Sequence, residues 1–124
     1  MADKVVDASA LAALAFAEPA VDLVIDEIEG HRLHAPTLVV FELMNVAWKR
    51  PKKQPAASAL FLQALDVLDG LGLRLRGVDR GEVVRLGLAT GLTAYDATYL
   101  WLARALGMPL VSLDKRLGAH AKQF

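Results

Sequence analysis

Short β-branched and apolar runs alternate with helix-forming segments along the whole chain. The run Lys4–Asp7 predicts a strand that ends in a carboxylate, and the segment 8–16 is rich in Ala and Leu, which favour helix. Further strands are expected at 32–35, 73–75 and 109–113. Because parallel strands are joined by crossover helices, this alternation predicts an α/β fold in which a central parallel sheet lies between layers of helices.

The other predicted helices rest on apolar periodicity and on capping signals. The segment 21–29 places apolar residues on one helical face and acidic residues on the other. Asp79 with Glu82, and Thr93 with Asp96, have the spacing of capping boxes, so each pair marks the start of a helix. Helices are therefore expected at 21–29, 36–50, 56–69, 79–88 and 94–106.

Composition narrows the class of protein. A chain of 124 residues with 55% hydrophobic content is expected to form one domain over residues 1–124. Charges interrupt every apolar stretch before the roughly 18–20 residues of a membrane span, and the N-terminus does not have the pattern of a signal peptide. The chain contains no Cys, which excludes disulfides and thiolate metal sites. These features favour a soluble protein in the reducing cytoplasm.

Two acidic residues stand where predicted strands end. Asp7 follows the first strand, and Asp114 follows the last. In an open parallel sheet, ligands bind beyond the carboxyl ends of the strands, so both carboxylates are expected at the same edge. The alternative is that each acid only caps the helix or turn that follows it, which is common for Asp.

Glu42 interrupts a strongly apolar helix. The segment around it is so rich in apolar residues that nearly every face of the helix is expected to be covered, and a buried carboxylate needs a cation or a hydrogen-bond donor. Asn45, one turn later, could help to hold it. The alternative is an exposed polar stripe that Glu42 forms with Asn45 and Lys49.

Asp96 lies in the first turn of a predicted helix, three residues after Thr93. Thr93 is expected to support this turn as its N-cap, and Asp96 could serve only in capping. A carboxylate in this position can also point across the crevice, so the two roles are compatible. Tyr95, Tyr99 and Trp101 are assigned to packing and given no chemical role.

Several carboxylates in one crevice repel one another unless a cation joins them. Oxygen-only ligands suit Mg²⁺ or Mn²⁺, which can acidify a water and stabilise charge on a phosphodiester. The three histidines, His31, His34 and His120, are poorly placed to form a competing zinc site.

Four segments resemble PIN domains, particularly VapC-type toxins. They are Val5–Leu11, Glu42–Asn45, Leu92–Tyr99 and Leu110–Asp114, in the family's order and at suitable spacing over nearly the whole chain. The resemblance implies a metal-dependent endoribonuclease, the toxin of a toxin-antitoxin pair. It also implies a homodimer that a cognate VapB-like antitoxin neutralises.

The resemblance also assigns roles by position. Asp7, Glu42 and Asp96 match the family's core metal ligands, and Asp114 matches the last acid, which often acts through water; all four are thus candidate catalytic residues.

Ser9 and Ser112 match hydroxyl positions that hold the first and last acids, although both could instead serve as ordinary helix caps or strand-end bonds. Lys115, Arg116 and Leu117 follow Asp114 with no further acid, which argues against a fully occupied second metal site.

A basic run follows the helix that carries Glu42. Lys49, Arg50, Lys52 and Lys53 could steer RNA phosphates towards the acids. Alternatively, these cations complement the dipole at the end of that helix and solubilise the loop. Because Lys and Arg together balance Asp and Glu, at 14 each, any affinity for RNA must come from such a local patch.

Rival functions remain open at this stage. A phosphoacceptor receiver domain would need adjacent acids after the first strand, and a haloacid-dehalogenase-like phosphatase would need a carboxylate in place of Ser9; both are disfavoured. An RNA-processing PIN nuclease that is not a toxin, and a catalytically silent module that binds RNA or protein, are the remaining alternatives.

Overall fold

The computed structural model describes residues 3–49 and 57–123. Its centre is a four-stranded parallel sheet with the strand order β3-β2-β1-β4. The strands are β1 (Asp3–Val6), β2 (Arg32–Pro36), β3 (Arg74–Arg76) and β4 (Leu110–Val111). The helices are α1 (Ala8–Ala15), α2 (Val21–Ile28), α3 (Leu38–Lys49), α4 (Ala57–Leu71), α5 (Arg80–Thr90), α6 (Ala94–Leu106) and α7 (Lys115–Ala121).

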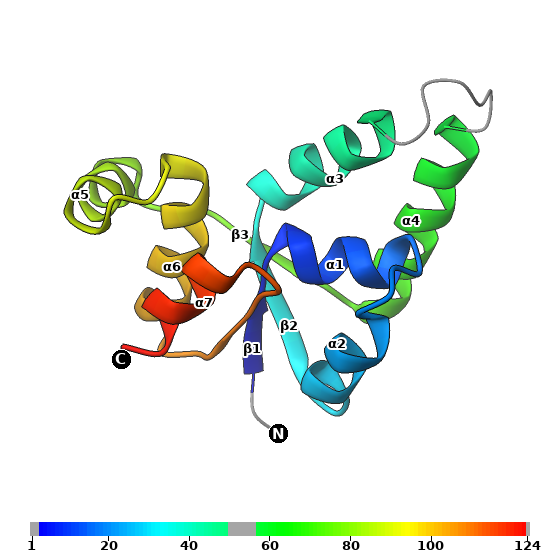
Figure 1. The fold of residues 1–124 in the computed structure, drawn as a ribbon, viewed down its shortest axis with the longest axis horizontal. Coiled ribbons are helices and arrows are strands. Elements are labelled where there is room, and N and C mark those ends of the chain that lie inside the picture. Colours follow the sequence, from blue (N-terminus) through cyan, green and yellow to red (C-terminus); the bar gives the residue numbers. More distant parts are fainter. Residues whose placement is uncertain (1–2, 50–56, 124) are drawn as a thin grey trace.

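Helices cover both faces of the sheet, which confirms the predicted α/β architecture. Figure 1 shows α1–α4 on one side of the strands and α5–α7 on the other. The two inner strands are well enclosed, with Val5 and Val6 of β1 fully buried and Leu33, His34 and Ala35 of β2 at most 2% exposed. On the α5–α7 side, α6 packs against β1 and β2 and buries most of its length, from Ala97 to Leu100 and again at Leu102 and Ala103.

The order of the strands determines where the functional side chains lie. β4 pairs with β1, and Val111 lies beside Val6 in the register. The residues that follow these two strands, Asp7 and Ser112, are therefore neighbours although 105 positions separate them. The strand order reverses between β1 and β4, and parallel α/β sheets bind their ligands beyond the carboxyl ends of the strands at such a point.

The end of the chain differs most from the sequence prediction. The last strand was expected over 109–113 but comprises only Leu110–Val111, and the side chain of Leu113 is 37% exposed. The backbone N–H of Leu113 donates to the hydroxyl of Ser9 rather than to a neighbouring strand, so the strand stops early. Helix α7 was not predicted because only Leu117 in it is buried, which leaves no apolar periodicity.

The other boundaries moved by one to two residues. α4 continues through Gly70 and ends before Gly72, whose φ of +62° is a left-handed conformation that favours glycine. α5 extends to Thr90, where Gly91 forms a left-handed C-cap. Among the described residues, none of the helices is both long and apolar enough to cross a membrane.

The expectation that α3 is covered on nearly every face was wrong. Phe41, Met44 and Trp48 are 66%, 45% and 61% exposed, whereas Val39, Leu43 and Ala47 are buried. The helix therefore has one face against α1 and α4 and a second apolar face towards solvent. The sequence of α3 is rich in apolar residues because the helix has two apolar faces, and the domain core buries only one of them.

Candidate active site

Asp7 is anchored at the start of α1 by neutral hydrogen-bond donors. Its Oδ1 accepts from the backbone N–H of Ala10 at 3.0 Å and from the hydroxyl of Ser9 at 2.7 Å, and its Oδ2 accepts from the hydroxyl of Ser112. The side chain is only 4% exposed. Asp7 thus caps the helix, as the alternative interpretation held, and it is also buried at the edge of the sheet.

The two predicted supporting serines converge on this one carboxylate. Ser9 accepts from the N–H of Leu113 at 2.9 Å, and Ser112 accepts from the N–H of Asp114 at 3.0 Å. Each hydroxyl therefore accepts a hydrogen bond from the loop after β4 and donates one to the carboxylate of Asp7. Both serines hold the first acid, and Ser112 also contacts the last acid by accepting from its backbone N–H.

Glu42 lies one turn into α3 and is partly buried. Its Oε1 accepts a short hydrogen bond from the hydroxyl of Tyr99, whose side chain is otherwise 2% exposed. Burial and the bond to Glu42 raise the pKa of Tyr99 far above the ordinary tyrosine value, so the phenol stays protonated and acts as the donor. Asn45 is exposed and has no hydrogen bond to Glu42 in the described structure.

Sequence reasoning missed the role of Tyr99. Tyr99 follows Asp96 by three residues, which places the two side chains on the same face of α6. That spacing was a usable signal: if Asp96 faces the crevice, so does the polar end of Tyr99.

Asp96 and Asp114 complete the edge. Thr93 caps α6 by accepting from the N–H of Asp96 at 3.2 Å, as predicted from their spacing. Asp114 caps α7 by accepting from the N–H of Leu117 at 2.9 Å, and it is exposed. Capping and a place beside another acid coexist at Asp7 and Asp114, because the charge of Asp114 acts on Asp7.

We call these four residues the acid cluster: Asp7, Glu42, Asp96 and Asp114. Burial is the first cause that raises the pKa of Asp7, Glu42 and Asp96. The neighbouring carboxylates add to it, because Asp114 raises the pKa of both Asp7 and Asp96, while Asp96 and Asp7 raise that of Glu42. The four acids thus form a closed ring of mutual repulsion.

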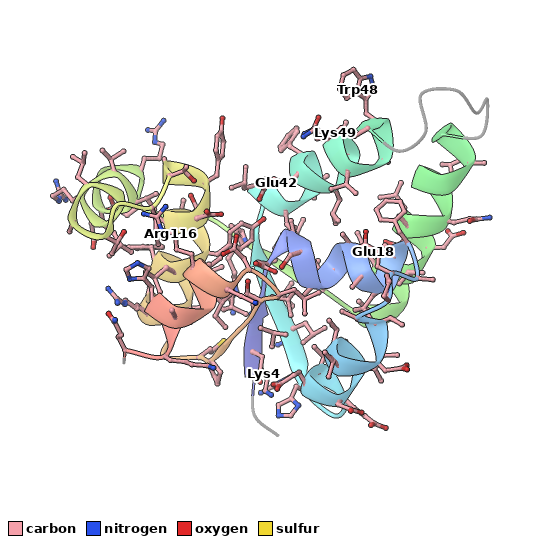
Figure 2. All side chains as sticks on the ribbon, in the orientation of Figure 1. Lys4, Glu18, Glu42, Trp48, Lys49 and Arg116 are labelled. Atoms are coloured by element: carbon pink, nitrogen blue, oxygen red, sulfur yellow. The ribbon has the colours of Figure 1, made fainter. Side chains whose placement is uncertain are left out.

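Among the residues that the structure describes, the cation of Arg116 acts on these acids. The guanidinium of Arg116 opposes the rise in the pKa of Asp96, and its Nη2 donates to the carbonyl of Gly91 at 2.7 Å. Figure 2 shows Arg116 on the α5–α7 side of the sheet, opposite Glu42 on α3. The carbonyl of Gly91 holds Arg116 at the margin of the acid cluster.

The donor set fits a hard divalent cation that retains water. All four acids offer oxygen atoms, and their repulsion is relieved when a cation binds between them. Within residues 3–49 and 57–123, no three His, Asp or Glu side chains form a ready-made metal site. Mg²⁺ commonly binds one or two carboxylates and keeps several waters, so four acids spread around an edge suit it.

Of the basic run, only Lys49 lies within the described residues. Lys49 is exposed at the end of α3 and lines a cavity of about 660 Å³ together with Ser9, Glu42 and Asn45. The predicted RNA-binding residues Arg50, Lys52 and Lys53 lie outside the described residues.

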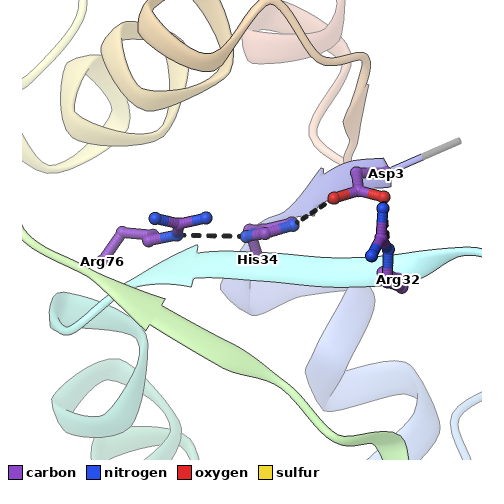
Figure 3. A network of polar contacts seen from close by, with 4 residues as sticks. All are labelled: Asp3, Arg32, His34 and Arg76. Carbon is purple, nitrogen blue, oxygen red and sulfur yellow. Dashed lines mark hydrogen bonds and ion pairs between the residues drawn. The ribbon is translucent and has the colours of Figure 1, made fainter.

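The buried histidine, His34, has partners of its own. His34, 1% exposed on β2, lies between Asp3 and Arg76: its Nε2 is 2.9 Å from Oδ2 of Asp3, and Nε of Arg76 donates to its Nδ1 at 3.2 Å (Figure 3). Because arginine can only donate, Nδ1 is the acceptor and Nε2 carries the proton. Arg32 also binds Asp3, at 2.8 Å, so this network is internally compensated and is separate from the acid cluster.

Known proteins resemble this chain in sequence and in fold. The family model of the PIN domain matches residues 4–123. Ribonuclease VapC3 of Pyrobaculum aerophilum is 30% identical over 118 residues, which cover 91% of this chain and 90% of that protein. Exonuclease VapC9 of the same organism is 33% identical over 119 residues, covering 94% and 84% respectively. The crystal structure of PAE2754 from Pyrobaculum aerophilum superposes with a TM-score of 0.79 at 30% identity, over 96% of this chain and 84% of that one.

Proposed function

The chain belongs to the PIN-domain family, and on this premise we propose that it is a metal-dependent endoribonuclease, the toxin of a toxin-antitoxin pair. One PIN domain spans residues 1–124, of which the family match covers 4–123. The observation that carries the proposal is the acid cluster, in which four carboxylates from four separate segments repel one another at the carboxyl edge of the sheet.

Each residue of the acid cluster has a distinct part. Asp7 is the most rigid, because three donors fix both of its oxygens. Tyr99 holds Glu42 from across the crevice, and Thr93 fixes the turn of Asp96. The exposed Asp114 is free to bind through water. A bound Mg²⁺ or Mn²⁺ supplies a Lewis acid that acidifies a water and stabilises charge on the phosphodiester.

RNA phosphates reach the site along a cationic path. Lys49 stands at the wall of the cavity beside Glu42, and Arg50, Lys52 and Lys53 follow it in the sequence. Phosphate contacts of this kind position a nucleic acid without reading its sequence.

The partners follow from the relatives and from the surface. Two relatives carry the name VapC, so the partner is a VapB-like antitoxin, and toxin and antitoxin act in the cytoplasm. The exposed apolar residues Met44 and Trp48 of α3 support protein contacts, including a homodimer. Figure 2 shows Trp48 projecting from the far end of α3, away from the sheet.

An exonuclease is the second candidate, because one relative carries that name. A circular single-stranded RNA separates the two activities, since it has no end for an exonuclease to attack. We expect the protein to linearise circular RNA in Mg²⁺ or Mn²⁺. Degradation of linear RNA alone would identify an exonuclease.

The test of the mechanism combines chelation with a matched pair of variants. Asp7→Asn is expected to lower cleavage by more than about 100-fold, since even changes to groups that orient a metal ligand cost about 10–100-fold. Asp79→Asn is the control, because Asp79 caps α5 as Asp7 caps α1 but lies outside the acid cluster. Thermal melts should show metal-induced stabilisation in the parent and the control, and less in Asp7→Asn. Cleavage that survives both chelation and Asp7→Asn would refute the mechanism.

A further inference from the structure

A cavity of about 660 Å³ lies directly beside the acid cluster. Ser9 of α1, Glu42 of α3 and Tyr95 of α6 contribute to its wall, so it lies among three of the segments that form the site. Its volume is within the range of pockets that bind small molecules. Glu42 belongs to both the cavity and the acid cluster, so a ligand in this cavity lies next to the acid cluster.

Two aromatic side chains line this cavity and are exposed to solvent. Phe41 is 66% exposed and Tyr95 is 64% exposed, and they come from different helices, α3 and α6. Aromatic rings usually bury their faces, because each carries a large apolar area. Two exposed rings on one cavity are suited to stack a flat aromatic ligand.

The polar residues of the cavity have the chemistry that a nucleotide requires. Asn45 is exposed and offers an amide donor and acceptor side by side, the arrangement that pairs with a base edge. Lys49, one turn further along α3, offers a cation for a phosphate. Stacking faces, an amide and a cation thus occur within one cavity.

We propose that this cavity is a base subsite that holds one unpaired nucleobase of single-stranded RNA, stacked on Phe41 or Tyr95, beside the scissile phosphate. The inference rests on the proposed nuclease function and adds a substrate contact to it. Stacking on aromatic side chains tolerates any base, whereas the amide of Asn45 supplies a preference among bases.

A protein segment fits this cavity less well than a base does. The exposed apolar residues Met44 and Trp48 of α3 do not line it, and its wall includes the carboxylate of Glu42 and the ammonium of Lys49. A docking peptide would favour Met44 and Trp48, which lie outside the cavity. The cavity itself combines rings with charged and amide groups, as sites for single-stranded nucleic acid do.

The experiment measures binding of a short single-stranded RNA, intact or with one abasic position moved along it. Binding is measured in the Asp7→Asn background without metal, so that cleavage does not interfere. Phe41→Ala and Tyr95→Ala are compared with Leu88→Ala, a control whose side chain is 82% exposed and lies outside the cavity. We expect at least one cavity variant to weaken binding by about 5- to 100-fold, and the control to leave it unchanged.

Coupling between protein and RNA changes identifies the subsite. When the abasic position coincides with the subsite, the cavity variant should cause little further loss of affinity, because the stacked base is already absent. Tyr95→Phe should retain binding, since it keeps the ring. Equal losses on intact and on every abasic RNA would overturn the proposal.

Other outcomes distinguish this proposal from the proposed function. If the parent cuts RNA in a metal-dependent way while both alanine variants bind and cut as it does, the base subsite is wrong and the nuclease stands. Variants that bind RNA normally but lose self-association in light scattering would assign the rings to a protein interface and overturn the subsite. A parent that neither binds nor cuts RNA would overturn both.

Discussion

The two ends of β1 carry aspartates with opposite electrostatic environments. Asp3, at the start, contacts His34 and Arg32, and hydrogen bonding to His34 is the first cause that lowers its pKa. Asp7, just after the end, contacts neutral donors and faces Asp114, and burial raises its pKa. Two acids four positions apart thus differ in whether the fold itself supplies the compensating charge.

Topology explains the difference. The register of β1 with β2 places Arg32 directly beside Asp3, so the acid is compensated by the neighbouring strand. At the carboxyl edge, the acids meet the N-termini of α1, α6 and α7, whose dipoles and N–H groups favour negative charge without neutralising it. A fully paired carboxylate contributes to structure, whereas an unpaired set is available to a cation and to substrate.

Within this comparison, the largest effect is expected from a variant that disturbs the carboxyl end of β1, beside Asp7, without removing an acid. Ser112→Ala deletes the donor to Oδ2 of Asp7 and the acceptor of the N–H of Asp114. Metal-dependent RNA cleavage should fall by about 10–100-fold, because Asp7 loses its orientation. Steady-state cleavage rates at several metal concentrations measure the effect. Ser9→Ala, which removes the other hydroxyl, should behave similarly; full activity in both variants would contradict a positioning role.

An intermediate effect, on stability, is expected at the start of β1, where Asp3 is paired with Arg32 and with His34. His34→Ala removes the buried bridge between Asp3 and Arg76 and leaves both without this partner. The free energy of unfolding should fall by about 1–3 kcal/mol, the usual cost of lost partners for buried polar groups. Urea denaturation measures it, with His31→Ala as the control, since His31 is less buried and bonds only the nearby carbonyl of Glu29.

Cleavage provides the second half of that test. The folded His34→Ala protein should cut RNA at the rate of the parent, because the Asp3 network is separate from the acid cluster. A variant of unchanged stability, or a folded one that has lost cleavage, would show that the two ends of β1 are not independent.

The smallest expected effect is that the contributions of Asp3 and Asp7 to stability change with pH in opposite directions. The lowered pKa of Asp3 means that its contribution to stability is present above the ordinary value of 3.8 and is lost as pH falls through its folded pKa. The raised pKa of Asp7 means that its contribution is present below 3.8 and is lost as pH rises through its folded pKa.

Metal-free melting curves from acid to neutral pH test this sign. Relative to the parent, Asp3→Asn should lose stability on going from acid to neutral pH, and Asp7→Asn should gain it. Parallel trends in the two variants would contradict the contrast between the ends of β1.

The sequence by itself determined the secondary elements and the edge at which the acids gather. Periodicity and caps are local, so the strand before Asp7 and the helix capped by Thr93 could be predicted from neighbouring residues. The parallel order of the strands then placed Asp7 and Asp114 at one edge. Helix α7 escaped prediction because only Leu117 in it is buried, and strand β4 was predicted but is shorter than the expected 109–113.

Only the tertiary structure decided that Tyr99 holds Glu42 and that Ser112, which was expected to hold the last acid, bonds the first. Tyr99 meets Glu42 across 57 positions, and Ser112 meets Asp7 across 105. The exposed face of α3 and the bridge through His34 could not be predicted from the sequence either, because both depend on what packs against an element. The physical reason is that a sequence pattern encodes the faces of one helix or strand, whereas a contact between distant elements depends on register and packing, which form only when the whole sheet is assembled.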